Sequence, residues 1–373
     1  MARTKVSCRH SDGWQQRTHE DRNERLPSVL QKVAPGTELR EGIDRIIKAG
    51  KGAIIVLGAD EKVERLVSGG FRMAASFTAQ RLSELAKMDG AIILDESCGK
   101  IVRANVHLVP DPTIPTAETG TRHRTAERVA RQTGAPVVSV SESMRIVTLY
   151  VDSTKHVLKE ISSILFRANQ ALSMLERYRN RLDEVSSGLS ALEIEDVVTL
   201  RDVVTVLQRA EMVRRIAVEI RMAIVELGGD GRLLHLQLNE LMLGVESERQ
   251  LVVRDYMVDG PRRHSSILAD FDCMGAEQLL DLGRFARVLG YAPGDGRIDR
   301  PVSPRGYRLL ARIPRLSDKV IAQLVGRFSS LARLLDASIS ELDQVEGIGE
   351  ARARLIKEGL ARLAESSILE RYA

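Results

Sequence analysis

Residues 90–109, GAIILDESCGKIVRANVHLV, contain two β-branched runs separated only by a short polar turn. Both runs, 90–95 and 100–109, have the length and composition of strands. Because no helix fits between them, we expect an antiparallel hairpin. A second pair, PVVSVS at 136–141 and RIVTLYV at 145–151, repeats the pattern. These pairs predict a sheet that is not purely parallel.

The segments around these pairs alternate between strand and helix patterns. GAIIVLG at 52–58 is a further strand, and helical spacing of apolar residues occurs at 39–47, 82–86 and 125–130. This alternation is typical of a mixed α/β domain. We therefore predict an α/β domain with a mixed central sheet over residues 26–153.

The composition changes after this domain. Residues 157–257 contain no proline, and apolar residues recur there at three- and four-residue intervals among Arg and Glu. The pattern predicts an all-α spine over 154–307, with breaks near 186–190 and 228–231. The Pro-, Gly- and Arg-rich stretch 291–307 closes it.

Composition restricts the class of protein. The 373 residues have 43% hydrophobic content and a net charge of +4, so they suit several folded domains, and bulk charge gives no argument for nucleic-acid binding. Aromatic residues make up 3%, too few for stacking platforms on single strands. Three scattered cysteines show no metal-ligand spacing, and no apolar run reaches membrane-spanning length. We expect a cytoplasmic protein with a disordered extension over 1–25 and no membrane contact.

The last segment, 308–373, contains an internal repeat with an offset of 32 residues. Leu310 matches Leu342, and Leu324 matches Ile356. The repeat predicts two similar helix–turn–helix units, making the chain a multidomain α/β and all-α protein.

The second repeat unit, ISELDQVEGIGEARARLIKEGL at 339–360, has a glycine turn between two helices. It resembles the helix-hairpin-helix family of DNA-binding motifs, with Gly347 and Gly349 around a buried Ile348. Backbone N–H groups at a helix start suit a DNA phosphate, so binding would be independent of sequence and sensitive to salt. The basic residues expected to assist are Arg352, Arg354 and Lys357.

The first unit departs from this motif. Arg315 and Ser317 stand where the glycines would be, so Arg315 and Lys319 would have to supply charge in place of backbone groups. The alternative is that both hairpins serve only for packing.

A cluster in the α/β domain suits phosphate. In ETGTRHRTAERVARQTG at 118–134 a glycine turn runs into a helix whose first turn carries hydroxyl, imidazole and guanidinium groups. Cations are disfavoured at a helix N-terminus unless an anion binds there. The cluster therefore predicts a polyphosphate site, and the alternative is that Arg122 and Arg124 simply pair with Glu118 and Glu127. His107 and His156 show no metal partners in the sequence, and we interpret both as structural.

Four motifs together carry a family resemblance. MDGAIIL at 88–94, ANVHL at 104–108, GTRHRTAE at 120–127 and SVSES at 139–143 resemble, in order and spacing, the diadenylate cyclase domain. The three-part organisation from about residue 26 to the C-terminus resembles the DNA-scanning members of that family.

The resemblance implies an activity and a set of site residues. Such enzymes join two ATP molecules into cyclic di-AMP, with release of two pyrophosphates, using Mg²⁺ or Mn²⁺. Asp89 would orient the ribose 3′-hydroxyl and hold the metal, and Gly90 and Leu108 would contact the nucleoside. The phosphate-binding and catalytic groups implied are Thr121, Arg122, His123, Arg124, Thr125 and Ser141.

The resemblance also implies an assembly. Two cyclase domains must face each other so that each 3′-hydroxyl attacks the other's α-phosphate. The family pattern suggests a homo-octamer, associated with the nucleoid, in which branched or damaged DNA lowers cyclase activity.

Two other functions remain open at this point. One is a DNA repair nuclease, although two-metal nucleases need several converging carboxylates and this site offers mainly Asp89. The other is a non-enzymatic scaffold that scans DNA structure and holds ATP only as a ligand.

Overall fold

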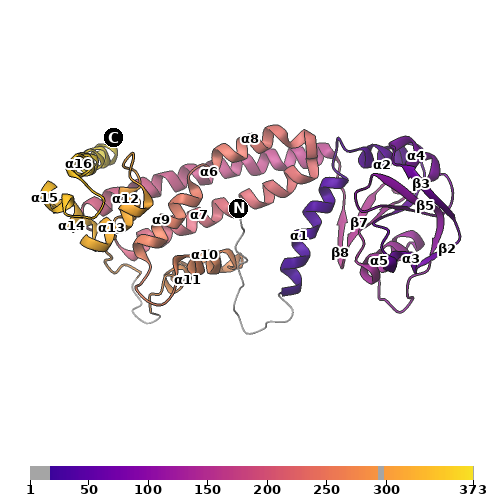
Figure 1. The fold of residues 1–373 in the computed structure, drawn as a ribbon, viewed down its shortest axis with the longest axis horizontal. Coiled ribbons are helices and arrows are strands. Elements are labelled where there is room, and N and C mark those ends of the chain that lie inside the picture. The colour runs from indigo at the N-terminus through magenta and orange to yellow at the C-terminus, as the bar shows by residue number, and fades with distance from the viewer. Residues whose placement is uncertain (1–16, 293–297, 373) are drawn as a thin grey trace. The chain divides into compact units, whose positions relative to one another are not determined.

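A computed structural model describes residues 17–292 and 298–372 (Figure 1). These residues form two compact units. One consists of 17–170 with 220–236, and the other of 171–219 with 237–372. Helices α6 (Ile161–Ile194), α7 (Leu200–Leu227) and α8 (Arg232–Leu241) contribute residues to both units.

The first unit is built on an eight-stranded sheet in the order β2-β5-β4-β1-β6-β7-β8, with β3 also paired to β5. Only β1 and β4 are parallel, and the other pairs are antiparallel, including both predicted hairpins. The mixed sheet is confirmed. The strands are β1 (Ala53–Leu57), β2 (Val67–Ser68), β3 (Phe71–Ser76), β4 (Ala91–Leu94), β5 (Lys100–Leu108), β6 (Val137–Val140), β7 (Val147–Val151) and β8 (Thr154–Val157).

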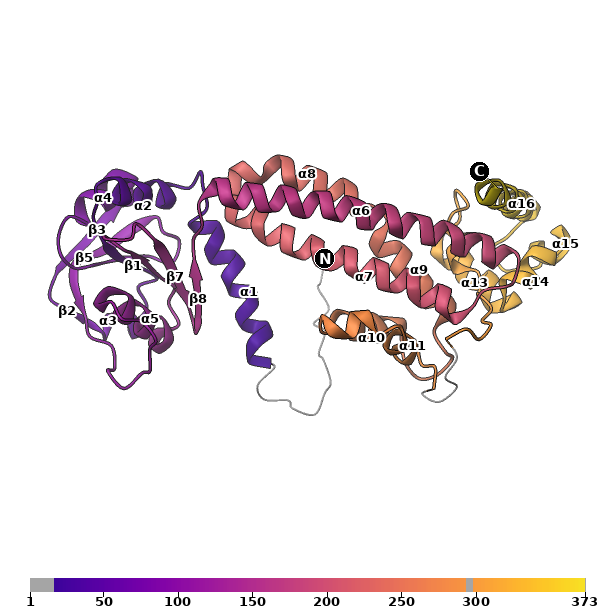
Figure 2. The ribbon, with the colours of Figure 1, turned by 180° about the vertical axis from the view of Figure 1, so that it is seen from behind.

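Helices cover both faces of this sheet. Helices α2 (Glu38–Lys48) and α4 (Ala79–Leu85) lie on one face, and α3 (Glu61–Glu64) and α5 (Thr121–Thr133) lie on the other (Figure 2). Alternate residues of a strand point to opposite faces. Along β1, Ile55 and Leu57 accordingly join the apolar cluster under α2 and α4, whereas Val56 joins the cluster under α5.

Two boundaries of this unit differ from the prediction. Helix α1 begins at Arg17 and ends at Lys32, so residues 17–25 are helical and do not belong to a disordered extension; residues 1–16 lie outside the described residues. Strand β8 pairs with β7 and completes the sheet, so the sheet extends past the expected end at 153. The first boundary was misplaced because the start of α1 is polar and shows no apolar periodicity. The second was misplaced because a short turn at Asp152, with φ 52°, leads directly into another strand.

The helical part continues with η1 (Gly228–Gly231), α9 (Val245–Tyr256), α10 (His264–Asp272), η2 (Glu277–Leu280) and α11 (Leu282–Val288). The break predicted at 228–231 is present as η1. The break predicted at 186–190 is wrong, because α6 runs through it. The Ser190 hydroxyl donates to the Ser186 carbonyl one turn back, and the Ser186 hydroxyl donates to Glu248. Helix and tertiary partners thus satisfy the hydroxyls that suggested a loop.

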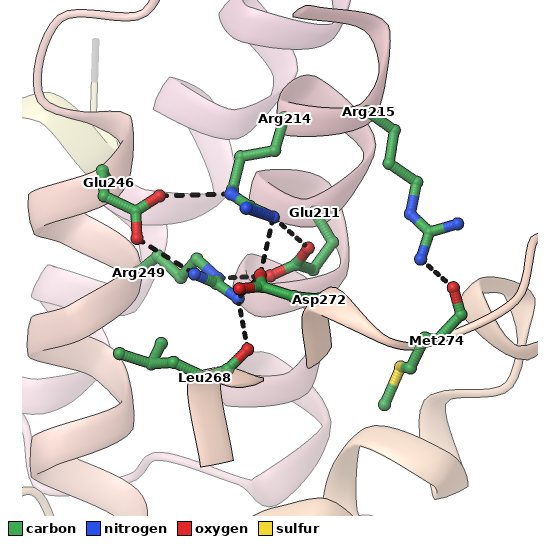
Figure 3. A network of polar contacts seen from close by, with 8 residues as sticks. All are labelled: Glu211, Arg214, Arg215, Glu246, Arg249, Leu268, Asp272 and Met274. Carbon is green, nitrogen blue, oxygen red and sulfur yellow. Dashed lines mark hydrogen bonds and ion pairs between the residues drawn. The ribbon is translucent and has the colours of Figure 1, made fainter. Parts of the chain in front are cut away.

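Arginines join α7, α9 and α10 within the second unit (Figure 3). The buried Arg249 guanidinium pairs with Glu211 on α7 and with Asp272 on α10, the latter at 2.6 Å. Arg214 lies beside it and reaches the same two carboxylates at 3.1 and 2.9 Å. Since each charge of this network has a partner of opposite sign, the ion pairs hold the three helices together.

The C-terminal hairpins also belong to the second unit. Their helices are α12 (Tyr307–Leu310), α13 (Asp318–Phe328), α14 (Leu331–Asp336), α15 (Ile339–Asp343) and α16 (Glu350–Tyr372). The starts of α12 and α15, like those of α13 and α16, are 32 residues apart, which matches the repeat. Among the described helices of the whole chain, none is both long and apolar enough to cross a membrane.

Buried polar groups attach the first hairpin to the helical region. The Asp255 carboxylate, at the end of α9, accepts the backbone N–H groups of Gly306, Tyr307 and Arg308 at 2.7 to 2.8 Å. The Arg308 side chain, which is fully buried, pairs with Glu193 on α6 at 2.5 Å. These contacts satisfy the N-terminus of the short helix α12 with a carboxylate from another helix.

Candidate active site and nucleic-acid interface

A cavity of about 550 Å³ opens at the edge of the sheet where β1 and β4 begin and β5 ends. Its lining includes Asp89 and Gly90 before β4, Leu108 at the end of β5, and the first turn of α5. With Ile54 and the 68–70 turn, five segments that are separate in the sequence meet at one place. The remaining lining residues are Ile54, Ser68, Gly69, Gly70, Ala91, Asn105, Val106, His107, Thr121, Arg122 and Thr125.

The Asp-Gly pair is held by close backbone contact. A Cβ atom on Gly90 would lie 2.7 Å from the main chain of Asn105, which itself has φ 54°. Glycine therefore lets the turn before β4 approach the β5 strand. The turn leaves the Asp89 side chain 95% exposed, so its carboxylate is free to meet a ligand.

The N-terminus of α5 faces the cavity. Gly120 precedes it in an extended conformation, and no side chain caps the helix start. The first N–H groups of a helix lack intrahelical partners and carry a partial positive charge. Thr121, Arg122 and Thr125 line the cavity beside them. Hydroxyl, guanidinium and helix N–H groups thus converge as the sequence predicts for an anion site.

Arg122 is the basic group nearest to Asp89. Its Nη2 atom lies 3.4 Å from Asp89 Oδ1, and its Nη1 atom lies 3.3 Å from Glu142 Oε2. Both contacts are long and solvated, so they hold the guanidinium weakly. The alternative pairing with Glu118 or Glu127 is wrong for Arg122, and Arg124 donates to the Thr119 carbonyl instead.

The neighbouring acidic residues have other partners. Glu118 accepts from the Tyr150 hydroxyl at 2.9 Å and pairs with Lys155 at 2.5 Å, while Glu127 pairs with Arg131 at 2.6 Å. Burial raises the pKa of Tyr150, and its hydrogen bond to Glu118 acts in the same direction. The hydroxyl therefore stays protonated and donates.

Three predicted site residues do not line the cavity. His123 packs edge-on against Tyr150 at 6.5 Å between ring centroids, and burial lowers its pKa. Arg124 points to the loop before α5. Ser141, at the end of β6, is buried, and its hydroxyl accepts the Met144 N–H at 3.3 Å.

Sequence reasoning missed several cavity residues. Gly69 and Gly70 form the turn between β2 and β3, and a Cβ on Gly70 would meet the Ala104 carbonyl at 2.7 Å. The Gly-Gly pair was the available signal. His107, interpreted as structural, lines the cavity, whereas His156 lies 3.3 Å from Glu226 on α7. Motif matching singled out ANVHL without showing which side chains faced outward.

The donors at the cavity fit a divalent metal only together with a substrate. Within the described ranges there is no group of three or more His, Cys, Asp or Glu side chains placed to hold an ion. Mg²⁺ usually takes one or two carboxylates and fills its remaining positions with phosphate oxygens and water. An exposed Asp89 with phosphate beside it satisfies that requirement.

The second C-terminal hairpin has the geometry that its glycines predict. Gly347 adopts φ 82°, and Ile348 is buried in the core of the hairpins. Arg352 donates to the Gly347 carbonyl at 2.6 Å, which closes the turn. The exposed Arg354 pairs with Glu350 within α16.

Lys357 differs from the expectation that it assists phosphate binding. Its ammonium donates to the carbonyls of Leu335 and Ala337 at 2.5 and 2.9 Å, at the end of α14. A cation is favoured at a helix C-terminus by the dipole and by the unpaired carbonyls. This lysine therefore ties α16 to α14 and is not directed outward.

The first hairpin reproduces the backbone of the second without its glycines. Arg315 has φ 66° at the position equivalent to Gly347, and Ser317 precedes α13 as Gly349 precedes α16. Arg315 and Lys319 are both exposed. Because both side chains are exposed, their charges are accessible to a ligand.

Two regions of the chain match family profiles. Residues 40–155 match the profile described as DisA bacterial checkpoint controller nucleotide-binding. Residues 158–296 match the one described as the DisA bacterial checkpoint controller linker region.

Curated relatives cover nearly the whole chain. The DNA integrity scanning protein DisA of Acidothermus cellulolyticus is 60% identical over 354 residues, 94% of this chain and 96% of the relative. The protein of the same name from Streptomyces coelicolor is 57% identical over 351 residues, 93% of this chain and 94% of the relative.

Two solved structures are similar to part of the chain. A hypothetical membrane spanning protein from Bacillus cereus has a TM-score of 0.30 and 25% identity, over 33% of this chain and 62% of that one. A double mutant of DacA from Staphylococcus aureus has a TM-score of 0.28 and 22% identity, over 38% and 90%. The matched profiles and the extent of identity with the curated relatives show that this chain belongs to the DisA family and carries its diadenylate cyclase domain.

Proposed function

We propose that the cavity between β4, β5 and α5 is the ATP site of this diadenylate cyclase, which makes cyclic di-AMP. The observation that carries the assignment is the uncapped start of α5, with Arg122, facing the exposed Asp89 across a cavity. A nucleotide needs an anion site and a carboxylate near its ribose, and both are present here. The nuclease alternative lacks the converging carboxylates that its chemistry requires.

The cavity residues divide into two groups by chemistry. Thr121, Arg122 and Thr125 bind the triphosphate through hydroxyl, guanidinium and helix N–H groups. Gly90 and Leu108, which both line the cavity, contact the nucleoside. Asp89 accepts a hydrogen bond from the 3′-hydroxyl and orients it for attack.

The three predicted residues away from the lining support the site from behind. His123, held against Tyr150, orients the first turn of α5, and Arg124 fixes the loop before it. Ser141 holds the turn that carries Glu142. We assign these side chains to shaping the phosphate site.

Asp89 would hold Mg²⁺ or Mn²⁺ together with the phosphates. Such an ion neutralises charge on the phosphate oxygens. The protein's own part is to place the carboxylate beside the ribose and the guanidinium beside the phosphates.

The reaction requires two subunits. One cavity holds one nucleotide, and closing a ring from two nucleotides needs a second cavity facing the first. The homodimer of cyclase domains is the minimum, and an octamer is our proposal for the full assembly.

The C-terminal hairpins are our candidate for DNA binding. The N–H groups at the start of α16, behind Gly347 and Gly349, suit a phosphate, and Arg315, Lys319 and Arg354 add exposed charge. Contact with backbone phosphates is independent of base sequence, which suits a protein that reads branched or damaged DNA. Binding of such DNA then lowers cyclase activity, and the protein is cytoplasmic and nucleoid-associated.

The first experiment incubates the protein with ATP and Mg²⁺ or Mn²⁺ and resolves the nucleotides by chromatography and mass spectrometry. We expect cyclic di-AMP from the wild type and none from Asp89→Asn, with DNA affinity equal in both. A wild type that binds ATP without turnover under either metal would favour the scaffold. Nicked or shortened DNA in the same reactions would favour the nuclease. Unchanged turnover after addition of branched DNA at low salt would contradict the regulatory part.

A further inference from the structure

The Arg122 guanidinium lies against the main chain at the start of β1. A Cβ atom built on Gly52 would overlap Arg122 Nη1 and would lie 3.0 Å from Arg122 Cζ. Gly52 is buried, and its φ is outside the left-handed region, so an L-residue could adopt its backbone conformation. The glycine is therefore needed for the space that it leaves, and Arg122 fills that space.

Other contacts of this guanidinium are weak. Asp89 and Glu142 approach it at 3.4 and 3.3 Å, and the side chains are 95% and 50% exposed. Exposed ion pairs of this kind restrict a long side chain little. The main chain beneath is the rigid part of its surroundings, because β1 is hydrogen-bonded on both sides to β4 and β6.

We propose that Gly52 is a positioning residue of the cyclase. Because Gly52 has no side chain, the Arg122 guanidinium packs directly against its Cα. This contact sets the position of the guanidinium relative to Asp89. The inference rests on the assignment of Arg122 to the triphosphate. A displacement of about 1 Å in a group that positions a substrate can cost about 100-fold in rate, so the missing methyl group matters for activity.

The substitution Gly52→Ala moves the arginine more readily than the strand. The overlapping atoms are at the far end of a flexible side chain. The nearest backbone atom, the Val140 carbonyl oxygen, would lie 3.1 Å from the new Cβ and needs to shift by a few tenths of an ångström. The fold therefore tolerates the methyl group while the guanidinium leaves its place.

A double-mutant cycle tests this. Gly52→Ala, Arg122→Ala and the double variant are compared for cyclic di-AMP turnover and for affinity toward a non-hydrolysable ATP analogue. We expect Gly52→Ala to lower kcat/KM about 10- to 100-fold and to weaken binding of the ATP analogue. In the Arg122→Ala background we expect no further loss of analogue affinity. The matched control is Gly188→Ala, since a Cβ there meets no atom within 4 Å, and it should match the wild type.

Four results would overturn the proposal. Equal loss of affinity in both backgrounds means that the methyl group acts on Val140 and not on Arg122. Full activity of Gly52→Ala means that the contact between Gly52 and Arg122 is unimportant for catalysis. A melting temperature of Gly52→Ala far below that of the wild type means that the strand moves. Wild-type analogue affinity in Arg122→Ala removes the arginine from the site, and this result alone also contradicts the proposed phosphate assignment.

Discussion

Arg315 and Gly347 occupy equivalent turns 32 residues apart and share a left-handed backbone, with φ 66° and 82°. A glycine adopts this conformation freely, whereas an L-residue pays about 1 kcal/mol or more. The first hairpin therefore keeps its turn geometry at a cost. Arg315 is also exposed, and its positive charge gives a functional reason for an arginine, rather than a glycine, in this turn.

Arg315→Gly should be more stable than Arg315→Ala. Both variants lose the same charge, but only glycine relieves the backbone, so we expect a difference of about 1 kcal/mol in the free energy of unfolding. Urea unfolding of the full chain, followed by a probe in the hairpins, measures this. Both variants should bind DNA equally, and more weakly than the wild type. Equal stability of the two would mean that the turn relaxes.

Lys357→Met should lower the free energy of unfolding without lowering the affinity for DNA. The ammonium donates to two carbonyls at the end of α14, and losing such a bond costs about 1 kcal/mol. Arg354→Met is the matched variant, because that side chain is exposed on the same helix. We expect it to lower DNA affinity and the salt slope with little effect on stability. The opposite pattern would return Lys357 to the DNA contact.

Local patterns predicted the sheet because its strands are continuous apolar runs. Strands β1, β4, β6 and β7 are buried on both faces, and β-branched runs bounded by turn residues identify such strands without knowledge of their partners. Strand β3 was missed because its residues FRMAAS are mostly exposed and lack β-branched side chains. The short edge strands β2 and β8 likewise depend on pairing with neighbours.

The candidate site was predictable only in part. A helix N-terminus rich in Arg and Thr signals an anion by itself, so Thr121, Arg122 and Thr125 followed from the sequence. Glu142 and Gly52 reach Arg122 only because β6 and β1 are neighbours in the sheet, and nothing in the local sequence shows that pairing. Motif adjacency also placed His123 with the phosphates, whereas its side chain packs against Tyr150.

Stability should fall as pH rises through neutrality because of Asp255. Burial raises the pKa of Asp255 to about 7, and the nearby Glu193 carboxylate adds to the rise, whereas the N–H groups of α12 oppose it. Since the folded pKa exceeds the unfolded value of 3.8, its contribution is complete below pH 4 and is lost as pH passes 7. Arg308, Glu248 and Tyr256 also face this network.

Asp255→Asn isolates this contribution, because the variant keeps an acceptor for α12 but does not titrate. We expect the stability of the wild type relative to the variant to decrease between pH 5 and pH 8, with a slope of at most about 1.4 kcal/mol per pH unit. Melting temperatures of both proteins across this range give the comparison. A constant difference would mean that Asp255 stays ionised throughout.

Glu142→Gln should tighten ATP binding. The carboxylate competes with the incoming phosphates for Arg122 Nη1 and also repels them, and exposed pairs of this kind are worth about 0.2 to 1 kcal/mol. We therefore expect KM for ATP to fall about 1.5- to 5-fold at low salt, with kcat no higher. The difference should shrink in high salt as the charges are screened. Glu41→Gln is the control, because Glu41 is also exposed and pairs with Arg45 on α2. An unchanged or higher KM would show that Glu142 holds Arg122 in its working position and does not compete with the phosphates for it.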